Sequence, residues 1–143
     1  MKEVGAVIGG EGNGGVIYAE SHYGRDALVG IALFLSSLAQ KGVTCSELRK
    51  TFPTYYIAKN RIDLTPDTDM DAILGKVKER FGSMDDVHVT DIDGVKLDFP
   101  TKWVHLRKSN TEPIMRVYSE AATMEEADAL GKELMDVVYE MTK

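Results

Sequence analysis

Trp103-Val104-His105-Leu106-Arg107-Lys108-Ser109-Asn110-Thr111-Glu112-Pro113-Ile114-Met115-Arg116-Val117-Tyr118-Ser119 is the stretch that decides the fold of the second part of this 143-residue chain. Apolar and polar residues alternate on both sides of a short polar segment, which predicts two strands with a loop between them. Pro113 biases the residue before it toward an extended conformation, so a strand can begin directly after the loop. We therefore expect strands over 103–107 and 114–119.

The loop between these strands has the chemistry of an anion-binding site. The hydroxyls of Ser109 and Thr111, the amide of Asn110 and main-chain N–H groups can all donate hydrogen bonds to phosphate oxygens. Arg107 and Arg116 add planar guanidinium groups that bind two oxygens at once. These groups fall within ten residues of a chain whose formal net charge is −6. A plainer interpretation stays open here, because Ser, Asn and Thr are ordinary turn residues and strand arginines often belong to a solvated face.

The segments around this stretch predict an α+β domain. The order of extended and helical segments after residue 53 is β-α-β-β-β-β-α, which implies two helices on one face of a mainly antiparallel sheet. We expect this sheet to be four-stranded and TBP-like. The predicted segments are strands over 54–64, 87–90, 95–99, 103–107 and 114–119, a helix from the capping residues 68–71 to Gly82, and a last helix from Thr123.

The first part of the chain predicts only a partial α/β segment. We expect a buried strand over 4–8, a second extended piece over 16–19 and a helix over about 25–40 that stops at Gly42. Thr44-Cys45-Ser46-Glu47 has the spacing of a capping box and opens a short helix. The pattern changes after Phe52-Pro53, and we divide the chain into residues 1–50 and 51–143.

Composition narrows the possible functions. The chain is 43% hydrophobic, which suits a packed core. Its acidic balance argues against nucleic acid or anionic membranes as partners, and no apolar run approaches the ~20 residues of a membrane span. Cys45 is the single cysteine, so an intrachain disulfide is excluded. Residues 1–5 have no signal-peptide pattern, so we expect a cytoplasmic protein.

Two motifs together resemble one enzyme family. Arg107-Lys108-Ser109-Asn110-Thr111-Glu112-Pro113, with Arg116-Val117 after it, resembles the phosphate-binding loop in the C-terminal domain of the α-D-phosphohexomutase family. This family includes phosphomannomutase/phosphoglucomutase and phosphoglucosamine mutase. Gly9-Gly10-Glu11-Gly12-Asn13-Gly14-Gly15-Val16 resembles the sugar-recognition loop of the third domain, whose usual form is Gly-Glu-x-Ser-Gly-His. Asn13 stands where serine is common and Gly15 where histidine is common, which affects the expected sugar more than the family.

The resemblance implies that the chain supplies binding rather than chemistry. Residues 1–50 would be the C-terminal part of the sugar-binding third domain, and residues 51–143 the C-terminal phosphate-binding domain. In the family, a phosphoserine in the first domain and a magnesium loop in the second domain carry out the transfer, and neither motif is present here. Asp91-Ile92-Asp93-Gly94 lacks the third Asp of such a loop and offers too few oxygens for magnesium, so we interpret it as a turn. We expect no catalytic residue, metal site or cofactor in this chain, with Mg²⁺ and the phosphoserine in the missing domains.

The implied reaction moves phosphate between the 1 and 6 positions of a hexose phosphate, and we expect glucosamine phosphate, with mannose and glucose phosphates next. The non-transferring phosphate would be held by Arg107, Ser109, Asn110 and Thr111, while Arg116 either joins them or orients the loop. Lys108 is excluded, because alternation along a strand places it on the opposite face from Arg107.

The sugar would be recognised by the glycine-rich loop. Glu11 would accept hydrogen bonds from two sugar hydroxyls, and Asn13 would recognise a neighbouring substituent. The glycines, including Gly14, would let the backbone approach the ring.

Alternatives remain. Residues 10–15 match the dinucleotide fingerprint Gly-x-Gly-x-x-Gly, but an extended segment follows and no acid ends a strand ~20 residues later. The chain could also be a stand-alone anion-binding or protein-interaction module without catalysis. The three histidines lack ligand spacing. As partners we expect a hexose phosphate, the missing N-terminal domains and, because residues 1–50 would expose apolar surface, self-association through that part.

Overall fold

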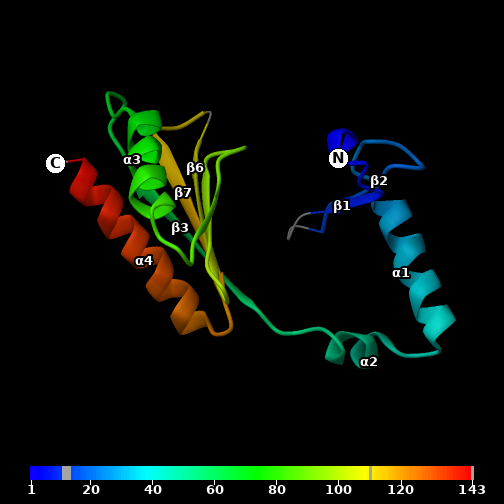
Figure 1. The fold of residues 1–143 in the computed structure, drawn as a ribbon. Coiled ribbons are helices and arrows are strands. Elements are labelled where there is room, and N and C mark those ends of the chain that lie inside the picture. The colour runs from blue at the N-terminus through cyan, green and yellow to red at the C-terminus, as the bar shows by residue number, and fades with distance from the viewer. Residues whose placement is uncertain (11–13, 110, 143) are drawn as a thin grey trace. The chain divides into compact units, whose positions relative to one another are not determined.

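A computed structural model describes residues 1–10, 14–109 and 111–142. The chain divides into two compact units, Met1–Pro53 and Thr54–Lys143. Figure 1 colours the chain from blue at the N-terminus to red at the C-terminus. No helix in the described part of the chain is both long enough and apolar enough to cross a membrane.

The second unit is an α+β fold, as predicted. Its strands form one sheet in the order β3-β7-β6-β5-β4, and every neighbouring pair is antiparallel. The elements are β3 (Tyr56–Asp63), α3 (Met70–Gly82), β4 (His88–Thr90), β5 (Val95–Asp98), β6 (Trp103–Lys108), β7 (Ile114–Ala121) and α4 (Met124–Met141). The sheet has five strands where we expected four, because all five predicted strand segments join it, with the short β4 paired with β5 at the edge.

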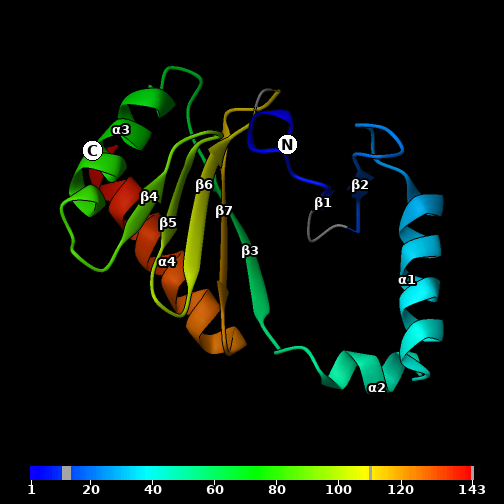
Figure 2. The ribbon, with the colours of Figure 1, turned by 45° about the vertical axis from the view of Figure 1, so that its right-hand side comes forward.

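The helices α3 and α4 cover the same face of this sheet (Figure 2). Residues along β7 alternate between buried and half-buried, so one face of the strand is covered and the other is open. The core lies between that covered face and the helices, where apolar burial supplies the main stabilisation. Fully buried members of the core include Ile62, Leu97, Val104, Leu106, Met115, Val117, Leu134 and Val138.

Local signals explain where the two helices begin and how α4 fits the sheet. Asp69 accepts a hydrogen bond from the backbone N–H of Ala72 and caps α3, one residue later than the predicted Thr68. Thr123 caps α4 as predicted. Inside α4, a Cβ at Gly131 would lie 2.9 Å from the Ser119 hydroxyl, so the missing side chain lets the helix approach β7 closely.

The first unit is smaller. It contains a 3₁₀ turn (Lys2–Val4), β1 (Ile8–Gly10), β2 (Val16–Tyr18), α1 (Ala27–Lys41) and α2 (Cys45–Lys50). The strand predicted over 4–8 is wrong, because Gly5 adopts a left-handed φ of 62° and ends the 3₁₀ turn there, so the strand begins only at Ile8.

The helix signals of this unit are confirmed. Gly42, with a left-handed φ of 64°, caps the end of α1 as predicted. The start of α1, for which no cap was predicted, is capped by Asp26. Thr44 and Glu47 form the predicted capping box of α2. Cys45 is exposed at the start of this helix.

Truncation of the central strand should destabilise the second unit strongly. Leu106→Ala removes a side chain with 0% exposure from the middle of the core, so we expect a loss of about 2–5 kcal/mol in the free energy of unfolding. Urea unfolding followed by the fluorescence of Trp103, the single tryptophan, would measure it. Ile92→Ala is the matched control, because Ile92 is 93% exposed and its loss should change stability by about 0.5 kcal/mol or less. Equal effects of the two substitutions would contradict the assignment of the core.

Candidate functional site

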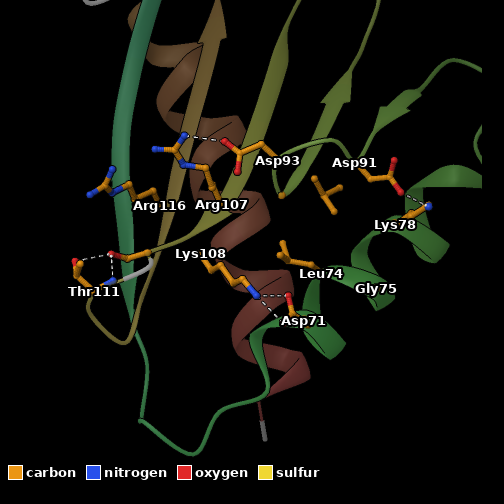
Figure 3. A pocket seen from close by; sticks show the side chains of 13 residues that line it. Asp71, Leu74, Gly75, Lys78, Asp91, Asp93, Arg107, Lys108, Thr111 and Arg116 are labelled. Carbon is orange, nitrogen blue, oxygen red and sulfur yellow. Dashed lines mark hydrogen bonds and ion pairs between the residues drawn. The ribbon is translucent and has the colours of Figure 1, made fainter. Parts of the chain in front are cut away.

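A cavity of about 580 Å³ lies in the second unit, where the β6–β7 loop, the β4–β5 turn and α3 meet (Figure 3). Four predicted phosphate-binding residues, Arg107, Ser109, Thr111 and Arg116, line this one cavity. Asn110 lies outside the described residues. The other lining residues are Asp71, Leu74, Gly75, Lys78, Asp91, Asp93, Gly94, Val95 and Lys108.

The β6–β7 loop holds two hydroxyls close together. The backbone N–H of Ser109 donates to the carbonyl of Ile114 at 2.9 Å, which closes the loop at the strand ends. The Ser109 hydroxyl oxygen then accepts the Thr111 N–H at 3.4 Å and lies 3.4 Å from the Thr111 hydroxyl. Two hydroxyls at this separation can donate to oxygens of one bound anion.

Arg107 is paired with a carboxylate of the β4–β5 turn. Its Nη1 donates to Asp93 Oδ2 at 2.9 Å, and both side chains are substantially exposed. Gly94 makes this approach feasible, because it has a φ of 80° and a Cβ there would overlap the carbonyl oxygen of Leu106. The sequence predicted the turn but not this ion pair, since only the packing of the turn on β6 brings Asp93 to Arg107.

Arg116 lies directly opposite Arg107 in the β6–β7 register. Like charges that face each other across a strand pair are destabilising. Among the residues that the structure describes, no carboxylate forms an ion pair with Arg116, although it lines the cavity. A bound anion would relieve the repulsion between the two arginines.

Lys108, which strand alternation excluded from phosphate binding, also lines the cavity. Its ammonium donates to both carboxylate oxygens of Asp71 in the first turn of α3, at 2.7 and 2.6 Å. The Lys108 ammonium is thus already paired with a carboxylate of the protein. Its exclusion from phosphate binding stays a prediction.

A third ion pair stands at the far side of the cavity. Lys78 of α3 donates to Asp91, and this hydrogen bond and the lysine charge lower the pKa of the Asp91 carboxyl below its ordinary value. Asp91 and Asp93 therefore each face a cation of the protein. Within residues 1–10, 14–109 and 111–142, no group of three His, Cys, Asp or Glu side chains is arranged to hold a metal ion.

The glycine-rich loop of the first unit borders a smaller cavity, of about 420 Å³. Gly14, a predicted sugar-binding residue, lines it with a φ of 85°. Glu11 and Asn13 lie outside the described residues. Arg25, which was not among the predicted site residues, also lines this cavity, next to the start of α1. No sequence motif marked this arginine, because its place depends on how the helix meets the loop.

Asp26 ties the start of α1 to β2 beside this cavity. Its backbone N–H donates to the carbonyl of Val16 at 2.8 Å. The N–H of Val29, and then the His22 side chain, hold the pKa of the Asp26 carboxyl below its ordinary value. The same hydrogen bonds that cap the helix thus favour the ionised form of this carboxylate.

Family comparisons agree with both motifs. Residues 1–56 match the model of phosphoglucomutase/phosphomannomutase α/β/α domain III, and residues 61–137 match that of the phosphoglucomutase/phosphomannomutase C-terminal domain. The chain belongs to the phosphoglucomutase/phosphomannomutase family. The resemblance drawn from the two loops is thereby confirmed.

Relatives of this mutase family match most of the chain. A phosphoglucosamine/phosphogalactosamine mutase from Sulfurisphaera tokodaii is 38% identical over 93% of this chain and 29% of its own length. A phosphoglucomutase/phosphomannomutase from Thermococcus kodakarensis is 38% identical over 89% of this chain and 27% of its own length. The chain thus spans less than a third of the relatives that it matches.

The fold is also that of a mutase-family structure. An X-ray structure of a phosphoglucomutase/phosphomannomutase family protein from Burkholderia thailandensis matches with a TM-score of 0.69 and 23% identity. The match covers 96% of this chain and 29% of that one.

Removal of the carboxylate that holds Arg107 should strengthen anion binding. Asp93→Asn frees the guanidinium, and because exposed ion pairs are worth about 0.2–1 kcal/mol, we expect inorganic phosphate to bind about 1.5- to 5-fold more tightly. NMR titration of the backbone amides of Ser109 and Thr111 would measure the affinity. Asp91→Asn is the matched control, since it removes the same charge from the same turn but from a carboxylate paired with Lys78. Equal gains in both variants, or weaker binding in Asp93→Asn, would refute competition between Asp93 and phosphate.

Proposed function

We propose that this chain is the sugar- and phosphate-binding portion of a phosphohexose mutase, an intramolecular phosphotransferase that moves phosphate between the 1 and 6 positions of a hexose phosphate. The observation that carries the proposal is the convergence of Arg107, Arg116 and the hydroxyls of Ser109 and Thr111 on one cavity. A guanidinium fork with nearby hydroxyl donors suits the oxygens of a phosphate monoester. Membership of the mutase family supports this choice over a stand-alone anion-binding module.

The role of the site is to position the substrate. Phosphoryl transfer depends mainly on alignment of the reacting groups and on stabilisation of charge. The phosphate that is not transferred would be held by Arg107, Ser109 and Thr111, with Asn110 and Arg116 as further donors, so that the other end of the sugar is presented to the reacting group. The phosphoserine and Mg²⁺ would belong to the other domains of the whole protein. This chain alone is therefore expected to bind without turning over substrate.

We favour a glucosamine phosphate as the substrate, followed by mannose and glucose phosphates. Glu11, Asn13 and Gly14 are the proposed contacts to the sugar. The glycine-rich loop has asparagine and glycine where serine and histidine are common in the family motif, which favours a different substituent on the ring. The Sulfurisphaera relative named as a phosphoglucosamine/phosphogalactosamine mutase supports this preference.

The apolar surface of α1 is the proposed contact with the rest of the whole protein. This helix has no buried residue, and Leu28, Ile31, Phe34 and Leu35 are all exposed. Contiguous exposed apolar surface indicates an interaction site. The domain III match and the greater length of the relatives favour the remaining segments of this domain as the cover, ahead of a second copy of the chain.

Kinetics of a full-length mutase that carries this segment would test the function. Arg107→Ala should lower kcat/KM by a factor that corresponds to on the order of 2–4 kcal/mol of transition-state stabilisation, because it removes a charged hydrogen bond to the phosphate. Lys132→Ala is the control, since Lys132 is exposed on α4 and does not line the cavity. An unchanged kcat/KM in Arg107→Ala, with phosphohexose as substrate, would overturn the phosphate assignment.

A further inference from the structure

We propose that Arg61, which neither motif includes, is a third phosphate-binding arginine that acts together with Arg116 and Arg107. The three residues form what we call the arginine row, one from each of β3, β7 and β6. This inference rests on the proposed function, because the ligand is the phosphate group of the hexose phosphate.

The strand register places the three arginines side by side. Arg61 is the direct partner of Arg116 in the β3–β7 pair, and Arg107 is its direct partner in the β6–β7 pair. Residues directly opposite each other in an antiparallel sheet point to the same face. Neighbouring strands are about 4.8 Å apart, so a phosphate above the central Arg116 lies within reach of the guanidinium groups on both sides.

This face of the sheet is open. The neighbours of the arginine row along the chain, Ile62, Leu106 and Val117, have 0% exposure and point to the helices. The arginines therefore point away from α3 and α4. Figure 3 shows the Arg116 side chain directed away from Arg107, toward the side on which β3 lies. The central guanidinium is thus placed toward Arg61.

The arginine row carries more positive charge than its partners neutralise. Arg107 pairs with Asp93 at 2.9 Å, and Arg61 Nε lies 3.4 Å from Asp63 Oδ1. Arg116, in the middle, forms no ion pair with any carboxylate in the described part of the chain. Like charges on directly opposite residues weaken strand pairing, so the arrangement lowers the stability of the unliganded protein and favours binding of a dianion.

Other cations on the same face show what a merely solvated arrangement looks like. Lys59 lies 5.8 Å from the centre of the ring of Tyr118, its partner on β7, and Lys96 of β5 lies 5.1 Å from the centre of the Trp103 ring on β6. Each of these cations contacts an aromatic ring that attracts it. In the arginine row, cations stand next to cations, and no aromatic ring contact involves any of them among the described residues.

The ion pair between Arg61 and Asp63 does not prevent this role. Both side chains are largely exposed, at 65% and 72%, and exposed pairs contribute little to stability. Arg61 can therefore leave Asp63 for a phosphate at small cost. The dianionic phosphate forms shorter and stronger hydrogen bonds with a guanidinium than neutral acceptors do.

The test is an NMR titration of the protein with inorganic phosphate and then with glucosamine 6-phosphate, for Arg61→Gln and its controls. We expect Arg61→Gln to weaken binding of both ligands about fivefold or more, as for loss of a charged hydrogen bond. Lys59→Gln removes the same charge from the same face, two residues earlier on β3, and should weaken binding less than about twofold. Arg61→Lys, which keeps the charge but loses the fork, should lie between Arg61→Gln and the unaltered protein.

Thermal unfolding provides a second readout that a structural role would not move in the same way. Without ligand, Arg61→Gln should leave Tm unchanged or raise it, because it relieves repulsion with Arg116. The rise in Tm that saturating phosphate produces should be smaller than in the unaltered protein, since weaker binding stabilises less. A Tm that falls without ligand while phosphate affinity stays the same would overturn the inference.

The variants also separate this inference from the proposed function. Normal binding in Arg61→Gln with weakened binding in Arg107→Ala would overturn the role of Arg61 and leave the phosphate site intact. Equal losses in Arg61→Gln and Lys59→Gln would show a general effect of charge and overturn a direct contact. Normal binding in both Arg61→Gln and Arg107→Ala, or no binding by the unaltered protein, would overturn the proposed phosphate site and this inference with it.

Discussion

The antiparallel pairing of β6 with β7 is the constraint on which both the core and the candidate site depend. It sets Leu106 opposite Val117 on the buried face and Arg107 opposite Arg116 on the open face. Because side chains alternate with a period of two, a slip of one residue would bury the arginines and expose the core. The apolar contacts with α3 and α4 therefore fix the positions of the charged groups on the other side of the sheet.

The short loop that joins these strands gains its geometry from the same pairing. The hydrogen bond from Ser109 N–H to the Ile114 carbonyl closes the loop at the end of the β6–β7 pair. The hydroxyls of Ser109 and Thr111 therefore lie in the loop just beyond Arg107. In the β4–β5 turn, Gly94 lets the backbone lie against β6, and this brings Asp93 to Arg107. The proposed donors to an anion and the carboxylate that is expected to compete with it are thus assembled by one stretch of sheet.

Much of this fold could be predicted from local sequence. Caps such as Gly42, Thr44 and Thr123 act within a few residues of themselves, and alternation marks β6 and β7 directly. Prediction failed where the outcome depends on distant partners or on a single backbone angle. The segment of β4 was predicted as a strand, but the expected sheet had one strand too few, because the pairing of β4 with β5 decides whether so short a segment joins it. Nor did the sequence show that the positive φ of Gly5 ends the first turn.

The candidate site likewise contains residues that a local motif could group and residues that only the folded chain brings together. Arg107, Ser109 and Thr111 are close in sequence, so a loop motif was enough to group them around one cavity. Asp93 is 14 residues from Arg107, and their contact needs the folded turn. Arg61 becomes a neighbour of Arg116 only through the register of β3 with β7, which no local pattern specifies. Arg25 likewise reaches the glycine-rich loop only when α1 is in place.

A rigid support explains how an open face can hold adjacent cations. The strands that bear the arginine row bury Ile62, Leu106 and Val117 completely on their other face, and close-packed interiors resist displacement. Repulsion between exposed arginines is weakened by solvent, whereas each buried aliphatic side chain contributes about 1.5–3 kcal/mol. The core therefore outweighs the repulsion and keeps the three arginine positions side by side on adjacent strands before any ligand arrives. An anion that binds there meets donors whose backbone is already ordered, and this preorganisation is a general source of affinity.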